Sequence, residues 1–147
     1  MQRWAERGWL RPHTSSAQEV AGLLSIVDRD LLDAARSEVS ADWRFAIAHS
    51  AILKLCTILL HAAGYRPERS QHHYRTLAVL PLILGEGRRA DAAYLDACRI
   101  KRNTIEYDVA GAATEADVVE LLQFAVGFRE EVLAWLREKH PGLLVES

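Results

Sequence analysis

Apolar residues recur at every third or fourth position through most of the chain, which is the spacing expected of amphipathic helices. The pattern predicts helical segments over residues 16–35, 40–64, 70–84, 90–108 and 114–140. Pro81 is expected to bend or end the third of these segments. The sequence has no strand-like alternation and no internal repeat. We therefore predict an all-α fold, most simply an antiparallel bundle of four to five helices.

Capping residues mark the expected starts of three of these helices. Ser16 with Glu19, and Thr114 with Asp117, have the three-residue spacing of a capping box. In such a box each side chain accepts a hydrogen bond from the other residue's backbone amide. Ser40 is expected to cap the second segment.

The segment 40–64 carries apolar side chains around nearly the whole circumference of a helix, so we predict that it is the buried central helix. His49 and Lys54 are among its few polar residues. We interpret them as a narrow stripe that reaches solvent or a carbonyl group of a neighbouring helix, in preference to a catalytic pair.

The chain has 147 residues, of which 50 % are hydrophobic, and this is the length of one domain. We expect a single domain over residues 1–147, with an N-terminal docking arm at 1–14 and the helical bundle at 15–140. The arm contains Trp4 and Trp9. Exposing both rings would leave a large apolar area in water, so the arm is expected to pack on the body or on a second subunit.

The formal net charge is −2, so any nucleic-acid role needs a local basic patch. Cys56 and Cys98 lie in apolar helical runs without a metal-like spacing, which is typical of free thiols in a reducing cytosol. The longest run without a charged residue, Leu55 to Tyr65, is only about half a membrane span. We predict a cytoplasmic protein that does not cross a membrane, and we expect no metal ion and no cofactor.

One cation breaks the apolar pattern of the fourth helix. Stepping by three and four residues places Leu95, Cys98, Arg102 and Ile105 on one seam, so Arg102 occupies a core position. A guanidinium does not lose its charge, and burying it unpaired costs several kcal/mol, roughly. Arg102 is therefore expected to face a carboxylate, a wet cleft, a subunit boundary or an anionic ligand.

A local basic bias surrounds this arginine. Residues 88–102 contain five cations and two acids, in a chain that is otherwise slightly acidic. Two adjacent histidines open the preceding helix, and they point about 100° apart, so they cannot chelate one metal ion as an i, i+4 pair would. The basic and imidazole side chains available to an anionic ligand in this region are Arg88, Arg89, Arg99, Lys101, Arg102, His72 and His73.

These features resemble the HEPN superfamily, small helical domains of prokaryotic nucleotidyltransferase, toxin–antitoxin and defence systems. The resemblance rests on the central helix that ends in Ala-Ala-Gly-Tyr-Arg at 62–66, the histidine pair at 72–73, and Arg102-Asn103 followed by Glu106-Tyr107. It covers about Ser16 to Trp135, and the Arg-Asn stretch is its specific part.

The resemblance implies a homodimer in which the arginine-bearing helices face each other across a cleft. Many members are metal-independent ribonucleases with an Arg-x4–6-His motif and a polar residue after the arginine. Arg102 and Asn103 match that motif, and Tyr107 stands where its histidine is expected. A tyrosine with a pKa near 10 is a poor proton-transfer group at neutral pH, so these three candidate catalytic residues favour binding over cleavage.

The resemblance further implies a toxin component of a toxin–antitoxin or defence module, with a nucleotidyltransferase antitoxin as partner. It implies RNA or a nucleotide as ligand, which the basic and imidazole residues of positions 72–73 and 88–102 would contact. His72 or His73 is an alternative source of the missing imidazole. A second hypothesis is a catalytically silent helical dimerisation or interaction module, in which Arg102 pairs with an acid and keeps helices in register. A third, Cys98 as a nucleophile, is opposed by its apolar flanks, which favour a core thiol.

Overall fold

The computed structural model describes residues 1–68, 72–107 and 110–144, and the side chains of His72, Glu106 and Tyr107 lie outside the described set. The long helices are α2 (Ala17–Ala34), α3 (Ala41–Ala62), α6 (Arg89–Tyr107) and α7 (Glu115–Lys139). The shorter elements are α1 (Gln2–Glu6), β1 (Leu10–Pro12), β2 (Tyr65–Pro67), α4 (His72–Ala78) and α5 (Leu80–Leu84), with 3-10 turns at Glu86–Arg88 and Pro141–Leu143. The prediction of a mostly helical protein is confirmed.

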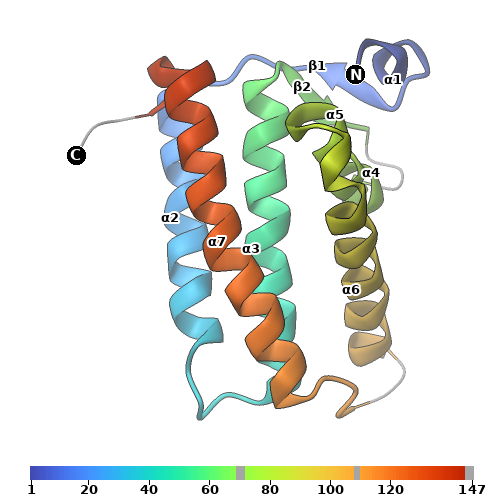
Figure 1. The fold of residues 1–147 in the computed structure, drawn as a ribbon, viewed down its shortest axis with the longest axis vertical. Coiled ribbons are helices and arrows are strands. Elements are labelled where there is room, and N and C mark those ends of the chain that lie inside the picture. The colour runs from blue at the N-terminus through green and yellow to red at the C-terminus, as the bar shows by residue number, and fades with distance from the viewer. Residues whose placement is uncertain (69–71, 108–109, 145–147) are drawn as a thin grey trace.

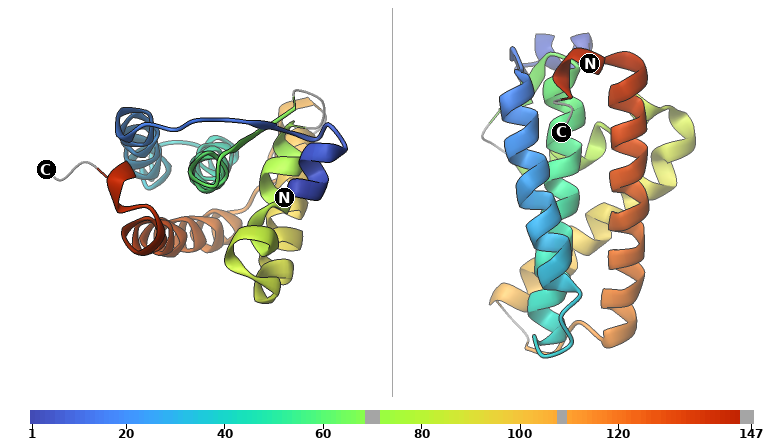
Figure 2. Two further views of the ribbon diagram at one scale, coloured as in Figure 1. Left: turned by 90° about the horizontal axis from the view of Figure 1, so that it is seen from above. Right: turned by 90° about the vertical axis from the view of Figure 1, so that its left-hand side faces the viewer.

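The central helix is α3, with α2 and α7 packed against one side and α4 and α6 against the other (Figure 1). A view along the helices shows the same arrangement, with α3 between the α2–α7 pair and the α4–α6 pair (Figure 2). Most of the side chains of α3 are buried, as its all-round apolar pattern predicts. By length and composition α3 could also span a membrane, but 67 % of its most apolar stretch is buried inside the fold, which makes this weak evidence.

One stripe of α3 is left uncovered, and we call it the open stripe. Its residues recur at helical spacing and are partly or well exposed, in contrast to the rest of the helix: Trp43, Ile47, Ser50, Lys54, Thr57 and His61. Trp43 is 68 % exposed, although tryptophan is usually well covered. The open stripe is therefore the side of the central helix that is available for contacts with other molecules.

The predicted caps are present, with one difference. The Ser16 and Ser40 hydroxyls accept hydrogen bonds from the third following amides, and Thr114 forms a complete capping box with Asp117. The second half of the box predicted at Ser16 is not formed, because the Glu19 carboxylate bonds to two histidines instead. Side-chain partners from distant segments have overridden the local motif at this position.

The structure contains a small sheet that the sequence pattern did not predict. β1 pairs antiparallel with β2, with Leu10 opposite Pro67 and Pro12 opposite Tyr65. The expectation that no strand occurs was wrong here, since strands of three residues that contain proline are too short for a readable alternation. The pairing lays the N-terminal arm across the ends of α2 and α3, and Leu10 is buried there against Leu60.

The third predicted helix is divided into α4 and α5. α4 ends at Ala78 and α5 begins at Leu80, with Pro81 in its first turn. Proline is tolerated in a first turn, where its missing amide hydrogen would have no helical partner. A bend or an end was expected at Pro81. In the structure the break lies just before it, because a new helix, α5, begins at Leu80.

Candidate functional site

Arg102 lies in a cleft between α3, α4 and α6. The cavity has a volume of about 380 Å³, and its lining comprises Ser50, Leu53, Lys54 and Thr57 of α3, His73 and Thr76 of α4, and Arg102 of α6. Three of the α3 residues belong to the open stripe. The apolar seam places Arg102 at a core position, and in the structure its side chain lines a cleft at the edge of the core. A cleft is one of the four environments expected for it.

The lining of this cleft suits an anion. It contains one arginine, one lysine, one histidine and three hydroxyl side chains, of which Thr57 already donates to the carbonyl of Leu53, and none of the described lining residues is acidic. Guanidinium, ammonium and hydroxyl groups are the donors that proteins commonly present to phosphate oxygens. A chain with a net charge of −2 therefore concentrates positive charge at this cleft.

Lys54 is held at the cleft by α2 as well as by its own helix. Its Nζ donates to the Ser50 Oγ at 3.1 Å and lies 3.9 Å from Oδ2 of Asp30. Asp30 is buried on α2 and also accepts a hydrogen bond from Arg29. Since the side chain of Lys54 is 29 % exposed, the ammonium remains accessible from the cleft.

His49 lies directly behind the cleft and is fully buried. Its Nε2–H donates to the backbone carbonyl of Leu95 at 3.3 Å, and its Nδ1 has no hydrogen-bond partner among the described residues. Burial lowers the pKa of His49 to about 4, the Leu95 carbonyl opposes this shift, and the charges of Arg102 and His73 add to it. His49 is therefore neutral at pH 7, in agreement with the structural interpretation of this residue.

Two of the basic residues predicted near Arg102 are bonded to acids and are not among the residues that line the cleft. Lys101 donates from Nζ to Oδ2 of Asp117 on α7 at 2.6 Å, and this contact helps to lower the pKa of Asp117 to about 2. Arg99 donates to Asp96 at 2.7 Å, and its guanidinium lies 5.8 Å from the ring centre of Tyr74. Lys101 therefore lies on the α7 side of α6 and outside the cleft lining.

The other predicted contacts are more remote. Arg88 pairs with Glu131 and Asp91, and Arg89 pairs with Glu86. Arg88 precedes Arg102 by fourteen helical residues, which is about 21 Å along the axis. The structure thus does not bring these two arginines to the cleft.

Of the motif residues beside Arg102, Asn103 is exposed on the outer side of α6. The side chains of Tyr107 and His72 lie outside the described residues, so their positions relative to Arg102 stay predictions. His73 does line the cleft with Arg102, which puts an imidazole at the predicted site.

Cys98 is a core residue. It is 6 % exposed, and burial raises the pKa of its thiol, while a hydrogen bond with Tyr94 acts in the opposite direction. A raised pKa reduces the thiolate fraction at neutral pH, so the nucleophile hypothesis receives no support from this environment.

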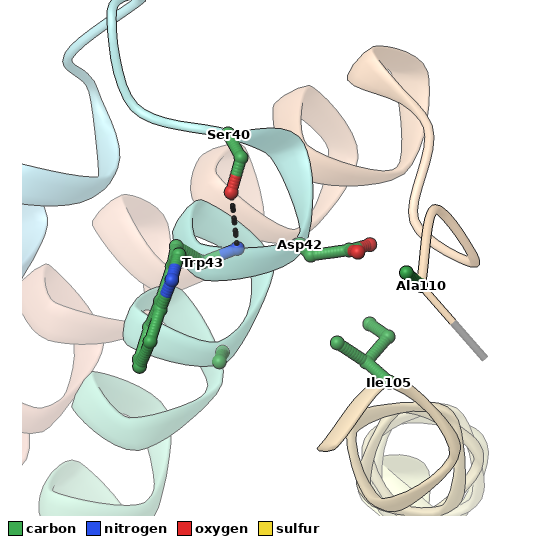
Figure 3. A pocket seen from close by; sticks show the side chains of 6 residues that line it. Ser40, Asp42, Trp43, Ile105 and Ala110 are labelled. Carbon is green, nitrogen blue, oxygen red and sulfur yellow. Dashed lines mark hydrogen bonds between the residues drawn. The ribbon is translucent and has the colours of Figure 1, made fainter. Parts of the chain in front are cut away.

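A second hollow, of about 340 Å³, lies between the start of α3 and the end of α6 (Figure 3). Asp42 points from α3 toward the segment that contains Ala110, and its carboxylate accepts hydrogen bonds from the amides of Gly111 and Ala113 at 2.6 and 3.1 Å. The carboxylate is thus engaged in fixing the chain before α7. An acidic group and apolar neighbours are also unfavourable for a phosphate, so this hollow is a weaker candidate than the Arg102 cleft.

Lys54, Ser50, Thr57 and Thr76 were not predicted as site residues. For the three residues of α3 the only signal was a polar stripe along an otherwise apolar helix, which we interpreted as structural, and Thr76 of α4 had no such signal. The stripe became informative once α4 and α6 were placed beside it.

No protein-family model, no curated protein and no solved structure matches this chain. The HEPN resemblance therefore stays a prediction that rests on the residues quoted for it.

Proposed function

We propose that the chain is a HEPN-like effector that binds RNA or a nucleotide through the Arg102 cleft. The observation that carries this proposal is the composition of the cleft, whose described lining combines Arg102, Lys54 and His73 with three hydroxyl groups and includes no acid, although Asp30 lies 3.9 Å from Lys54 behind it. Such a set favours the phosphate groups of the ligand. The motif resemblance adds RNA as the class of ligand.

Binding without rapid cleavage is the activity that this set of residues favours. Cleavage of RNA without a metal ion requires a group that transfers protons near neutral pH, and Tyr107 at the motif position serves this poorly. His49 is buried, with a pKa lowered to about 4, and its Nε2 is held by a backbone carbonyl. His73 is the remaining imidazole at the cleft, so it is the residue to test for any cleavage.

The cellular role that follows from the resemblance is a cytoplasmic toxin component of a toxin–antitoxin or defence module. Its partner would be a nucleotidyltransferase antitoxin. This part of the proposal depends on the RNA-binding function and is tested after it.

Substituting Arg102 by alanine is expected to weaken RNA binding about tenfold to hundredfold, because a charge-assisted hydrogen bond to phosphate is lost. The measurement is fluorescence anisotropy of a labelled single-stranded RNA in EDTA, titrated with parent and variant at several salt concentrations. The slope of log affinity against log salt should become shallower by about one unit or slightly less.

Arg36→Ala is the matched control, because Arg36 is an exposed arginine, 63 % accessible, beyond the end of α2. It should bind RNA like the parent. Equal affinities for the parent and Arg102→Ala, or no binding by the parent, would contradict the proposal and leave the silent interaction module. If the parent cleaves the RNA and His73→Ala does not, the protein is a nuclease that uses His73.

A homodimer is the second part of the proposal, and the exposed Trp43 on the open stripe favours it. A large aromatic ring in water is typical of an interface, and the open stripe is continuous with the Arg102 cleft.

Trp43→Ala is therefore expected to convert a dimer into a monomer, measured as mass by light scattering during size exclusion. Val126→Ala is the control, since Val126 is 50 % exposed on α7 and away from the open stripe. The dimer through this face is refuted if the parent is monomeric at micromolar concentration, or if Trp43→Ala keeps the mass of the parent.

A further inference from the structure

Two histidines and a glutamate meet where the N-terminal arm crosses the ends of α2 and α3. Oε1 of Glu19 is 2.8 Å from Nε2 of His13 and 2.5 Å from Nδ1 of His61. One potential ligand atom from each residue lies within 4.8 Å of the other two. The side chains of His13, Glu19 and His61 are 22 %, 30 % and 15 % exposed, so the cluster is sheltered yet reachable from solvent.

The backbone holds the three side chains in place before any ligand arrives. His13 follows β1, and its amide donates to the carbonyl of Gly64 at 2.9 Å, which extends the pairing of β1 with β2. Glu19 is fixed in the first turn of α2 by the Ser16 cap. The rings of His13 and His61 are 4.1 Å apart between centres. Preorganised donors of this kind lower the entropic cost of binding an ion.

We propose that His13, Glu19 and His61 form a binding site for a divalent transition-metal ion, with Zn²⁺ as the best fit. Two imidazole nitrogens and one carboxylate oxygen are a common zinc ligand set, whereas Mg²⁺ and Ca²⁺ prefer oxygen ligands. In a tetrahedral zinc site the ligand atoms lie about 3.3 Å apart. The distances from Oε1 of Glu19 to the two histidine nitrogens would therefore lengthen by less than about 1 Å when the ion replaces the hydrogens of these hydrogen bonds.

The ion would join the arm and the start of α2, which are neighbours in sequence, to the distant end of α3. With three protein ligands, the fourth position is filled by water. The site would therefore stabilise the docked arm, and it is separate from the residues that line the Arg102 cleft.

The test begins with the full chain freed of metal by EDTA and then dialysed. Calorimetric titration with ZnCl₂ alone should show one ion per chain, and MgCl₂ should show none. A free Zn²⁺ concentration about 100-fold above Kd should raise Tm by roughly 5–10 °C. The RNA-binding assay contains EDTA, so failure of one proposal leaves the other testable.

Three variants identify the ligands: His13→Gln, Glu19→Gln and His61→Gln. Each variant should bind no zinc ion in the titration and show no rise in Tm with zinc. Circular dichroism shows whether each variant is folded. His13 and Glu19 lie in the arm and the first turn of α2 and not in the buried central helix, so these two variants decide the matter even if His61→Gln unfolds. His140→Gln is the control, because His140 lies beyond α7, and it should bind like the parent. The proposal is overturned if the parent binds no zinc ion, or if His13→Gln and Glu19→Gln still bind one zinc ion per chain.

Discussion

Replacing Arg44 by alanine is expected to lower the free energy of unfolding by about 3 kcal/mol. Arg44 is 5 % exposed on α3, and its Nε donates to the carbonyl of Ala34 at 2.8 Å. That carbonyl belongs to the last residue of α2, which has no partner within its own helix. The Nη1 atom of Arg44 also donates to Glu115 in the first turn of α7 at 2.6 Å. One guanidinium thus joins the end of α2 to the start of α7, and the substitution leaves a buried carbonyl without its donor.

Urea denaturation at pH 7.5 measures this loss, and two controls separate its causes. Glu115→Ala takes the carboxylate from the buried guanidinium but leaves its hydrogen bond to Ala34, so it should cost about 1–2 kcal/mol, less than Arg44→Ala. Arg36→Ala removes an exposed arginine and should change the stability by no more than about 0.5 kcal/mol. If Arg44→Ala is as stable as Arg36→Ala, the buried hydrogen bond to α2 does not have the role given to it here.

Lowering the pH from 7.5 to 5 is expected to cost the protein about 2 kcal/mol of stability through His49 alone. In the unfolded chain this histidine takes up a proton as the pH falls through about 6.5. In the folded protein its pKa is lowered to about 4 by burial, with a further contribution from the charges of Arg102, His73 and Arg99. The unfolded state therefore binds more protons between about pH 6.5 and 4, and stability falls as the pH falls through this window.

The comparison of parent with His49→Gln isolates this contribution. The glutamine variant is expected to be less stable at pH 7.5, since the fully buried imidazole and its bond to Leu95 are lost. Its further loss between pH 7.5 and 5 should be about 2 kcal/mol smaller than that of the parent. His61, whose pKa is also lowered by burial, contributes equally to both proteins and cancels. Identical pH dependences would show that His49 titrates at its ordinary value.

The helical architecture could be predicted because its signals are local. Caps at Ser16, Ser40 and Thr114 and the three-to-four-residue spacing of apolar side chains define where the long helices start and which faces they bury. Arg102, which the apolar seam singled out, lines a cleft beside the core, and its role as a site residue stays a prediction.

The partners of each polar side chain could not be predicted in this way. Lys101 and Arg102 are neighbours in sequence, but one helical step turns the chain by about 100°, so they face α7 and the cleft respectively. Glu19 had the spacing of a capping-box residue, yet its carboxylate binds His13 and His61. A local motif identifies which bonds a side chain is able to form, and competing partners from other segments decide which of them is formed.

By itself the sequence determined that this is a mostly helical protein with a buried central helix and a cationic side chain where a core residue is expected, because these properties follow from periodicity within one segment. Only the tertiary structure decided that Arg102, Lys54 and His73 line one cleft and that His13, Glu19 and His61 meet at the arm. Each group combines residues that lie about twenty or more positions apart, such as Lys54 with Arg102 and Glu19 with His61, and their proximity results from how helices pack against one another, which no single segment encodes.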